Sequence, residues 1–182
     1  MSTPFTGDSG AEIAAVVNSR LRDVPDFPIP GVLFKDIVPL LADGEAFAAC
    51  VAALAAQAGD IDVVAGVEAR GFVLAGALAR ELGCGLVPVR KAGKLPPPTI
   101  AREYALEYGT ATIEVPVDVL DGRRVLLVDD VLATGGTLRA AADLIDEAGG
   151  AVAQIGVVLE LGFLNGRSIV GDLAPLHALL TL

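Results

Sequence analysis

The sequence predicts an α/β protein with a central parallel β-sheet flanked by helices. Three observations support this prediction: short runs rich in β-branched apolar residues recur along the chain, segments with helical periodicity separate them, and 53% of the 182 residues are apolar. Apolar strands that alternate with helices are typical of a parallel sheet covered on both faces. A chain of this length is most simply a single domain with a substantial core.

Helices are expected in four segments that have apolar spacing or helix-end signals: residues 11–22, 44–57, 70–83 and 137–147. In the first segment, Ile13, Val17 and Leu21 recur at helical spacing. Asp43 is placed to cap the start of the second helix, because a short carboxylate accepts from the free N–H groups there. Gly83 is placed to end the third helix.

Buried strands are expected in four apolar runs: residues 61–67, 85–90, 123–128 and 151–161. Residues 104–115 alternate around Gly109, which favours a hairpin. Residues 24–36 and 91–103 are rich in proline or glycine, so we expect both to be irregular, since proline fixes φ and lacks an N–H donor.

Composition excludes several classes of function. The net charge of -10 argues against nucleic-acid binding, which requires a basic face. No apolar run approaches the roughly 18 residues of a membrane span, and the N-terminus lacks a secretory signal, so we expect a cytoplasmic protein without membrane contact. The two cysteines and single histidine do not suggest a disulfide framework or a zinc site.

Three chemically distinctive loops follow predicted strands: "EARG" at 68–71, "KAGK" at 91–94 and "DDVLATGGT" at 129–137. Ligands of parallel sheets bind at the carboxyl ends of the strands. We therefore expect these three loops to converge on one ligand.

The "TGGT" turn is suited to an anion, because glycine allows close backbone approach and the following helix begins with unpaired N–H groups. The alternative is a plain turn capped by Thr137. Asp129 and Asp130 favour the first interpretation, since carboxylates beside a phosphate cradle can bind sugar hydroxyls or a hydrated Mg²⁺. A sugar phosphate satisfies both halves of the motif.

Several segments of the sequence resemble those of a known enzyme family. "VLLVDDVLATGGT" resembles the phosphoribosyl pyrophosphate (PRPP) motif of type I phosphoribosyltransferases. "DFPIPGVLFKDIVPLL", "GVEARGF", "VRKAGKLPPPT", "LEYGTATIEV" and "LELGFLNGR" are similar, in the same order, to segments of the adenine-specific members, over about residues 24–182. The resemblance implies the type I fold with a small N-terminal hood and a flexible loop or hairpin. It also implies one domain over 1–182, with the hood in 1–40 and the PRPP-binding core in 41–182.

The resemblance further implies a role for each site residue. PRPP and AMP would be bound by Asp129, Asp130, Ala133, Thr134, Gly135, Gly136 and Thr137, with the acids on the ribose hydroxyls. Pyrophosphate would be bound by Arg70, Arg90, Lys91 and Lys94. Adenine would be bound by Leu33, Phe34, Lys35 and Val131. Arg70 and Glu107 would be the catalytic residues, with Glu107 handling the purine proton.

Two of these residues could instead have purely structural roles: Phe34 as a core aromatic, and Glu107 as a solvent-facing glutamate. Glu103 is the nearest competitor of Glu107 for the role in proton transfer. Ala92 stands where the family often has a further basic residue. The resemblance also implies a cis peptide bond between Glu68 and Ala69.

The implied reaction is adenine plus PRPP giving AMP and pyrophosphate, a step of purine salvage. Mg²⁺ would be held mainly by PRPP, with no direct protein ligand, and through water to Asp129 and Asp130. A homodimer is implied, because the basic loop reaches the neighbouring subunit's site in this family. Two alternatives stay open: a phosphoribosyltransferase for another purine, and a catalytically silent regulator that senses PRPP or a nucleotide. The segments "FPIPGVLFKD" and "LEYG" weigh against the first alternative. The absence of a basic face and of an added domain weighs against the second.

Overall fold

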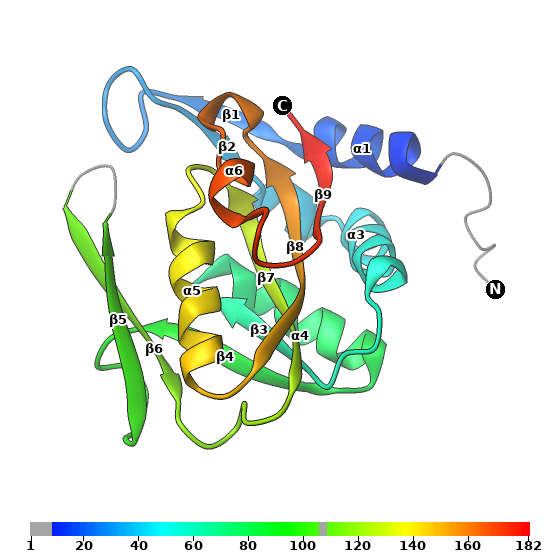
Figure 1. The fold of residues 1–182 in the computed structure, drawn as a ribbon. Helices are drawn as coiled ribbons and strands as arrows, with labels where there is room; N and C mark the ends of the chain where they lie inside the picture. The colour runs from blue at the N-terminus through cyan, green and yellow to red at the C-terminus, as the bar shows by residue number, and fades with distance from the viewer. Residues whose placement is uncertain (1–8, 106–108) are drawn as a thin grey trace.

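The computed structural model describes residues 9–105 and 109–182 as an α/β fold around a seven-stranded sheet (Figure 1). Strand order is β5-β6-β4-β3-β7-β8-β9. The strands are β3 (Val63–Val67), β4 (Gly85–Lys91), β5 (Thr99–Ala105), β6 (Thr110–Pro116), β7 (Arg124–Leu132), β8 (Ala151–Glu160) and β9 (Leu176–Thr181). Five neighbouring strands, β4-β3-β7-β8-β9, are parallel, and β5 and β6 add an antiparallel hairpin at the β4 edge. The predicted fold class is confirmed.

Helices cover both faces of the parallel strands. They are α1 (Ser9–Arg20), α2 (Val38–Ala42), α3 (Gly44–Gln57), α4 (Arg70–Leu82), α5 (Gly136–Glu147) and α6 (Arg167–Val170), with a 3₁₀ turn at Gly162–Leu164. Successive side chains of a strand point to opposite faces, so β7 contributes Leu127 to a core shared with α5 and Leu126 to a core shared with α1, α3 and α4. This two-sided burial is what the continuous apolar runs predicted.

Two predicted helix ends are confirmed by their geometry. The Asp43 carboxylate accepts hydrogen bonds from the backbone N–H groups of Glu45 and Ala46, at 3.2 and 3.1 Å, and so caps α3. Gly83 ends α4 with a left-handed φ of 69°, a conformation that glycine adopts without steric cost. The first helix was predicted to run to residue 22, but it ends at Arg20 because Arg22 begins a strand.

Two loops that were expected to be irregular contain strands. The segment 24–36 contains the end of β1 (Arg22–Pro25) and the whole of β2 (Leu33–Asp36), which form a separate antiparallel pair at the top of the view in Figure 1. Its proline stands at the end of a two-stranded ribbon, where a missing N–H donor matters least. Likewise β5 begins at Thr99, five residues before the predicted hairpin, and pairs with β6 from Thr99↔Pro116 to Ala105↔Thr110.

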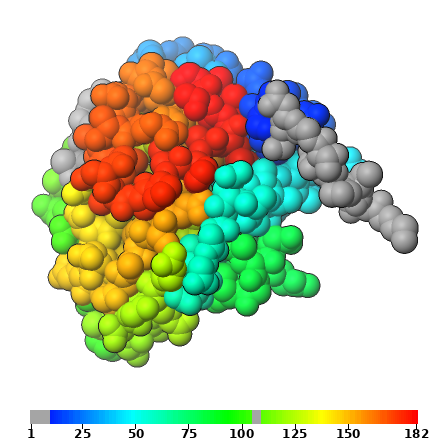
Figure 2. Space-filling view, turned by 45° about the vertical axis from the view of Figure 1, so that its right-hand side comes forward, coloured from blue at the N-terminus to red at the C-terminus, as the bar shows by residue number. Residues whose placement is uncertain are grey.

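The last strand, β9, was not predicted. It pairs with β8 in parallel from Ile155↔Leu176 to Glu160↔Thr181, and in the space-filling view it lies between the segment that follows β8 and helices α1 and α3 (Figure 2). In the parts of the chain that the structure describes, no helix has the length and apolar character needed to cross a membrane.

Candidate active site

The three distinctive loops meet at one edge of the sheet, as predicted. Because β4, β3 and β7 are parallel neighbours, their carboxyl ends lie side by side. The turn 68–69 leads from β3 into α4, the turn 133–135 leads from β7 into α5, and residues 92–94 follow β4. The Glu68–Ala69 peptide bond is cis, as the family resemblance implied.

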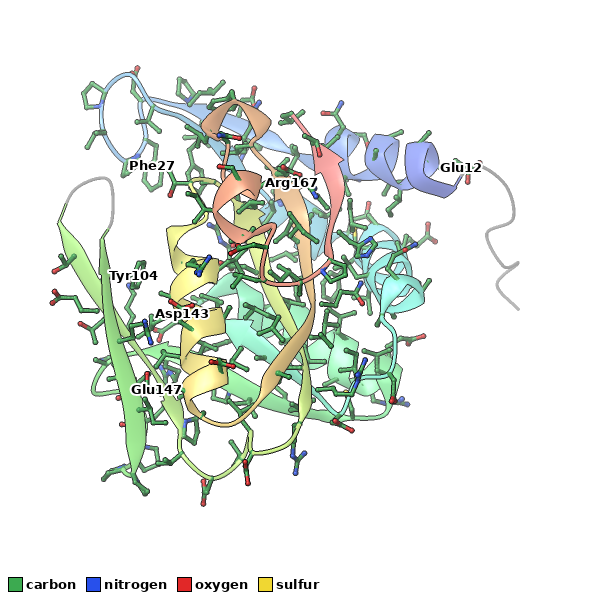
Figure 3. The ribbon with its side chains drawn as sticks, viewed as in Figure 1. Glu12, Phe27, Tyr104, Asp143, Glu147 and Arg167 are labelled. Atoms are coloured by element: carbon green, nitrogen blue, oxygen red, sulfur yellow. The ribbon has the colours of Figure 1, made fainter. Side chains whose placement is uncertain are left out.

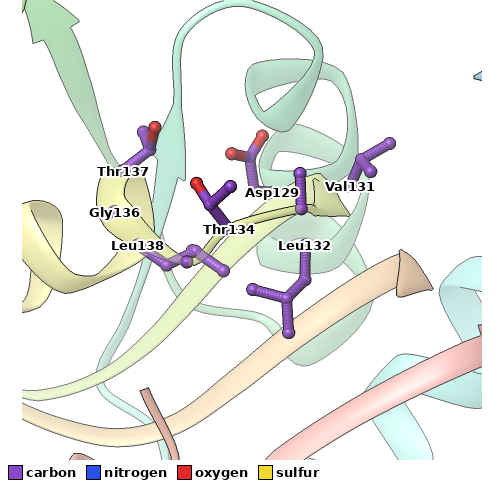
Figure 4. A pocket seen from close by; sticks show the side chains of 9 residues that line it. Asp129, Val131, Leu132, Thr134, Gly136, Thr137 and Leu138 are labelled. Carbon is purple, nitrogen blue, oxygen red and sulfur yellow. The ribbon is translucent and has the colours of Figure 1, made fainter. Parts of the chain in front are cut away.

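A pocket of about 60 Å³ lies where β7 turns into α5 (Figure 4). It is lined by Asp129, Val131, Leu132, Ala133, Thr134, Gly135, Gly136, Thr137 and Leu138. Gly135 precedes α5 at φ 86°, and no side chain caps that helix end. The first N–H groups of α5 therefore remain available at the positive end of the helix dipole. This geometry favours the anion cradle over a turn capped by Thr137.

Gly166 packs closely against the turn that leads from β7 into α5. A Cβ on Gly135 would lie 2.6 Å from the Gly166 carbonyl oxygen, and a Cβ on Gly166 would overlap the Ala133 carbonyl oxygen. Side chains at either position would push the turn out of shape. Gly166 was not predicted as a site residue. The only indication in the sequence was that it lies in "LELGFLNGR", one of the segments that resemble the family.

The acidic pair is buried at the end of β7, with Asp129 9% and Asp130 6% exposed. Asp129 Oδ1 accepts a hydrogen bond from the Asp130 N–H at 2.9 Å. Burial, reinforced by the neighbouring Asp130 charge, raises the pKa of Asp129 well above its usual range. Arg70 Nε lies 2.9 Å from Asp130 Oδ2, yet the alignment is not that of a hydrogen bond, and this buried oxygen accepts none within the described residues. Asp130 Oδ2 is thus an open acceptor.

Arg70 also connects the acids to the N-terminal hairpin. Its guanidinium carbon lies 5.4 Å from the centre of the Phe34 ring, within cation–π range. Phe34 in turn meets Phe27 edge-on, with ring centres 5.1 Å apart; Phe27 lies on the hairpin's loop (Figure 3). The Phe34 side chain is half-buried in this group and is not part of either core cluster of the described residues. The core-aromatic alternative for Phe34 is therefore disfavoured.

Other predicted base-contacting residues flank this group. Leu33 is 53% exposed on β2, and the Lys35 ammonium lies 2.7 Å from Asp23. Val131 lines the pocket from β7.

The basic turn after β4 is held by two glutamates that sequence reasoning missed. Glu68 Oε2 accepts from the Lys91 N–H at 2.9 Å and lies 3.4 Å from Arg90 Nε. Glu114, only 4% exposed, accepts from the Lys94 and Leu95 N–H groups at 2.8 Å each. Although burial raises the pKa of Glu114, these backbone donors hold it below its ordinary value. Alternation alone could not show that Glu114 faces this turn.

Lys91 and Lys94 are exposed and form no ion pair within the described residues. Arg90 Nη1 donates to the Lys94 carbonyl oxygen at 3.1 Å, so these three cations share one turn. Glu107 lies outside the described residues, whereas its competitor Glu103 is exposed on β5. The strand that carries Glu103 is tied to α5 by Arg102, which lies 3.2 Å from Asp143 and 3.3 Å from Glu147.

Comparison with known proteins defines the class. The phosphoribosyl transferase domain family matches residues 40–165. This range contains the acidic pair, the turn at 133–137 and the basic turn after β4. The chain and its fold are thus those of a type I phosphoribosyltransferase.

Individual relatives narrow this assignment. An adenine phosphoribosyltransferase of Kineococcus radiotolerans is 58% identical, covering 100% of this chain and 99% of that protein. One of Salinispora tropica is 55% identical, covering 99% of this chain and 97% of that protein. The crystal structure of adenine phosphoribosyltransferase from Rhodothermus marinus has a TM-score of 0.88 at 46% identity, covering 94% of this chain and 99% of that one. The chain belongs to the adenine phosphoribosyltransferase family.

Proposed function

We propose that this chain transfers the 5-phosphoribosyl group of PRPP to adenine, giving AMP and pyrophosphate in purine salvage. The observation that carries the proposal is the placement of the acidic pair: Asp129 lines the pocket, and the adjacent Asp130 lies against Arg70, which in turn lies against Phe34. The expected sites for the 5′-phosphate, the ribose, the pyrophosphate and the base are therefore adjacent, as these groups are in PRPP and the attacking adenine.

The 5′-phosphate binds in the turn Ala133–Thr137, where backbone N–H groups and the threonine hydroxyls are its donors. Asp130 accepts a ribose hydroxyl at its open Oδ2, and Asp129 accepts the second. Arg70, Arg90, Lys91 and Lys94 neutralise the pyrophosphate. The unpaired state of both lysines within the described residues supports this role.

Adenine lies between Phe34 and Val131. The Lys35 ammonium is already paired with Asp23, which supports a role for the backbone of Leu33 and Lys35 in pairing with the edge of the base. Backbone pairing discriminates, because a buried donor or acceptor that meets the wrong partner costs about 1–3 kcal/mol. A 6-oxo purine is therefore rejected.

Mg²⁺ suits this site as a hydrated ion shared with the substrate. Among the described residues no group of three or more histidine, cysteine or acidic side chains is arranged to hold a metal ion, whereas two buried carboxylates stand together at the ribose site. Asp129 and Asp130 would contact the ion through water, a mode that Mg²⁺ commonly uses with phosphate substrates. When bound, the ion supplies positive charge that assists departure of pyrophosphate.

Catalysis on this proposal is chiefly positioning and electrostatics. Arg70 stabilises the leaving pyrophosphate while the acids hold the ribose, whose C1 becomes oxocarbenium-like before adenine attacks with inversion. Glu107 exchanges the proton of the purine. The hairpin β1–β2 forms the hood within residues 1–40, and residues 41–182 form the PRPP-binding core.

A homodimer is part of the proposal. The basic turn of one subunit reaches the site of its partner, where Lys91 and Lys94 add charge to the pyrophosphate pocket. Sedimentation of the purified chain measures the assembly, and a strictly monomeric active enzyme would contradict this part.

The function is tested by mixing the chain with Mg²⁺, PRPP and, separately, adenine, hypoxanthine, guanine or xanthine. Nucleotide and pyrophosphate are expected in equal amounts with adenine alone. Product with another base only would assign a different purine. Binding of PRPP without product from any base would leave the silent regulator.

A further inference from the structure

The hydroxyl of Tyr104 contacts the phosphate turn from outside the pocket. Thr137 Oγ1 lies within hydrogen-bond distance of Tyr104 Oη, at 3.3 Å, across a separation of 33 residues in sequence. Thr137 lines the pocket, whereas Tyr104 does not. A polar group of the β5–β6 hairpin is therefore one hydrogen bond away from the predicted phosphate site.

The position of Tyr104 is determined by contacts other than its hydroxyl. Its half-buried ring packs against the core cluster under α5, and its backbone pairs with Ala111 of β6. Two residues earlier, Arg102 ties β5 to Asp143 and Glu147 of α5; Tyr104, Asp143 and Glu147 are labelled in Figure 3. The hydroxyl is thus held at Thr137 by a frame that does not depend on it, and phenylalanine at this position keeps the frame.

We propose that Tyr104 is a positioning residue for the 5′-phosphate and acts through the Thr137 hydroxyl. A hydroxyl has a single proton to donate and can accept from other donors. In the empty pocket either hydroxyl can donate to the other across this 3.3 Å separation. A phosphate oxygen in the pocket takes the Thr137 proton, because a hydrogen bond to an anion is roughly twice as strong as a neutral one.

Tyr104 is then left as the donor to Thr137 Oγ1. The result is a chain of donors from Tyr104 through Thr137 to the phosphate, in which each hydrogen bond polarises the next. It fixes the Thr137 side chain in the orientation that binds phosphate. It also gives the β5–β6 hairpin a direct link to the occupied phosphate site.

This inference rests on the proposed function, because it places a ribose phosphate in the pocket. A merely structural Tyr104 hydroxyl would support the hairpin whether or not the Thr137 hydroxyl was present. The two roles are separated by a double-mutant cycle with ribose 5-phosphate as the probe, measured by calorimetry.

Tyr104→Phe is expected to weaken ribose 5-phosphate binding about two- to tenfold, the contribution of one hydrogen bond. In a Thr137→Val background Tyr104→Phe is expected to have no effect on binding. In a Thr137→Ser background, which keeps the hydroxyl, Tyr104→Phe is expected to weaken binding again. Adenine affinity is expected to stay constant throughout. Equal weakening in the parent and in the Thr137→Val background, or no weakening in either, would overturn the inference.

A spectroscopic measurement can detect directly that ligand binding makes the Tyr104 hydroxyl a donor. The chain has two tyrosines and no tryptophan, so Tyr108→Phe leaves Tyr104 as the only phenol. The near-ultraviolet absorption of a phenol depends on whether its hydroxyl donates or accepts, and ribose 5-phosphate does not absorb there. Addition of ribose 5-phosphate should shift the Tyr104 band to longer wavelength, and Thr137→Val should abolish the shift.

The control ligand is free ribose, which should leave the band unchanged. A shift that survives Thr137→Val, or no shift upon saturation with ribose 5-phosphate, would contradict the relay while leaving the proposed function intact. If the unsubstituted chain bound no ribose 5-phosphate at all, the phosphate assignment itself would fall, and the inference with it.

Discussion

Replacing Asp129 by asparagine is expected to stabilise the ligand-free protein at neutral pH while weakening its binding of PRPP. Asp129 is 9% exposed, and burial together with the Asp130 charge raises its pKa well above the usual range. The carboxylate is therefore costly to ionise in the folded state. Asparagine has nearly the same shape, and its Oδ1 can still accept the Asp130 N–H hydrogen bond at 2.9 Å.

The direction follows from linkage between ionisation and folding. Burial and the neighbouring Asp130 charge make ionisation of Asp129 less favourable in the folded than in the unfolded state, so removing the ionisable group should raise the free energy of unfolding at neutral pH. Because the folded pKa is raised, the contribution of Asp129 is most favourable below its unfolded pKa of about 4 and is lost as pH rises through the folded value. The advantage of the variant should therefore be absent near pH 4 and grow toward neutral pH.

Thermal and urea unfolding of both proteins, without ligand and across this pH range, measure the effect. Each kcal/mol of stabilisation should raise Tm by about 2–4 °C in a domain of this length. Asp60→Asn is the matched control, because that side chain is 92% exposed and the same chemical change there should leave stability nearly unchanged. The reasoning is refuted if Asp129→Asn is less stable than the parent at neutral pH, or if its advantage does not depend on pH.

Three further substitutions test the proposed roles. Asp130→Asn should weaken PRPP binding about 10- to 100-fold by calorimetry, because a hydrogen bond to a charged acceptor contributes about 1.5–3 kcal/mol; unchanged affinity would remove Asp130 from the ribose site. Glu107→Gln should lower kcat by about 10²–10⁴ with a much smaller change in PRPP affinity, and unchanged turnover in steady-state assays would disprove its role in proton transfer. Phe34→Leu should raise the KM for adenine and leave that for PRPP nearly unaltered, since the aromatic face is lost while Asp130 keeps its partner Arg70; an equal rise in both constants would argue against stacking.

The parallel core was predictable because its signals are local. Strands β3, β4, β7 and β8 are apolar runs bounded by turns, and the cap at Asp43 and the stop at Gly83 lie where short-range rules place them. The loops at the carboxyl ends of these strands converge because parallel strands leave their ends at one edge. Sequence could therefore bring Arg70 and Asp130 to the same site without any contact information.

The elements that were missed depend on partners far along the chain. β9 is a strand because β8 offers it an edge, and the short β1–β2 pair exists because Leu33–Asp36 folds back on Arg22–Pro25. Glu114 likewise acquires its role only when β6 lies beside β4 and faces the turn at residues 94–95. Such roles are set by pairing at a distance, which a pattern along the sequence does not record.

The unfavourable ionisation of Asp129 and the open acceptor of Asp130 have the same origin. Both carboxylates are more than 90% buried in a chain of net charge -10, and Arg70, the ion-pair partner of Asp130, also lies against Phe34. A core selected for stability alone would place apolar or neutral side chains at the end of β7, since replacing a buried charge by a neutral group is often stabilising. The hydroxyl groups of a ribose would donate hydrogen bonds to the acceptor that the folded chain leaves unsatisfied, Asp130 Oδ2. A substitution that makes the empty protein more stable and the ligand bind more weakly would therefore mark Asp129 as a residue retained for its ligand.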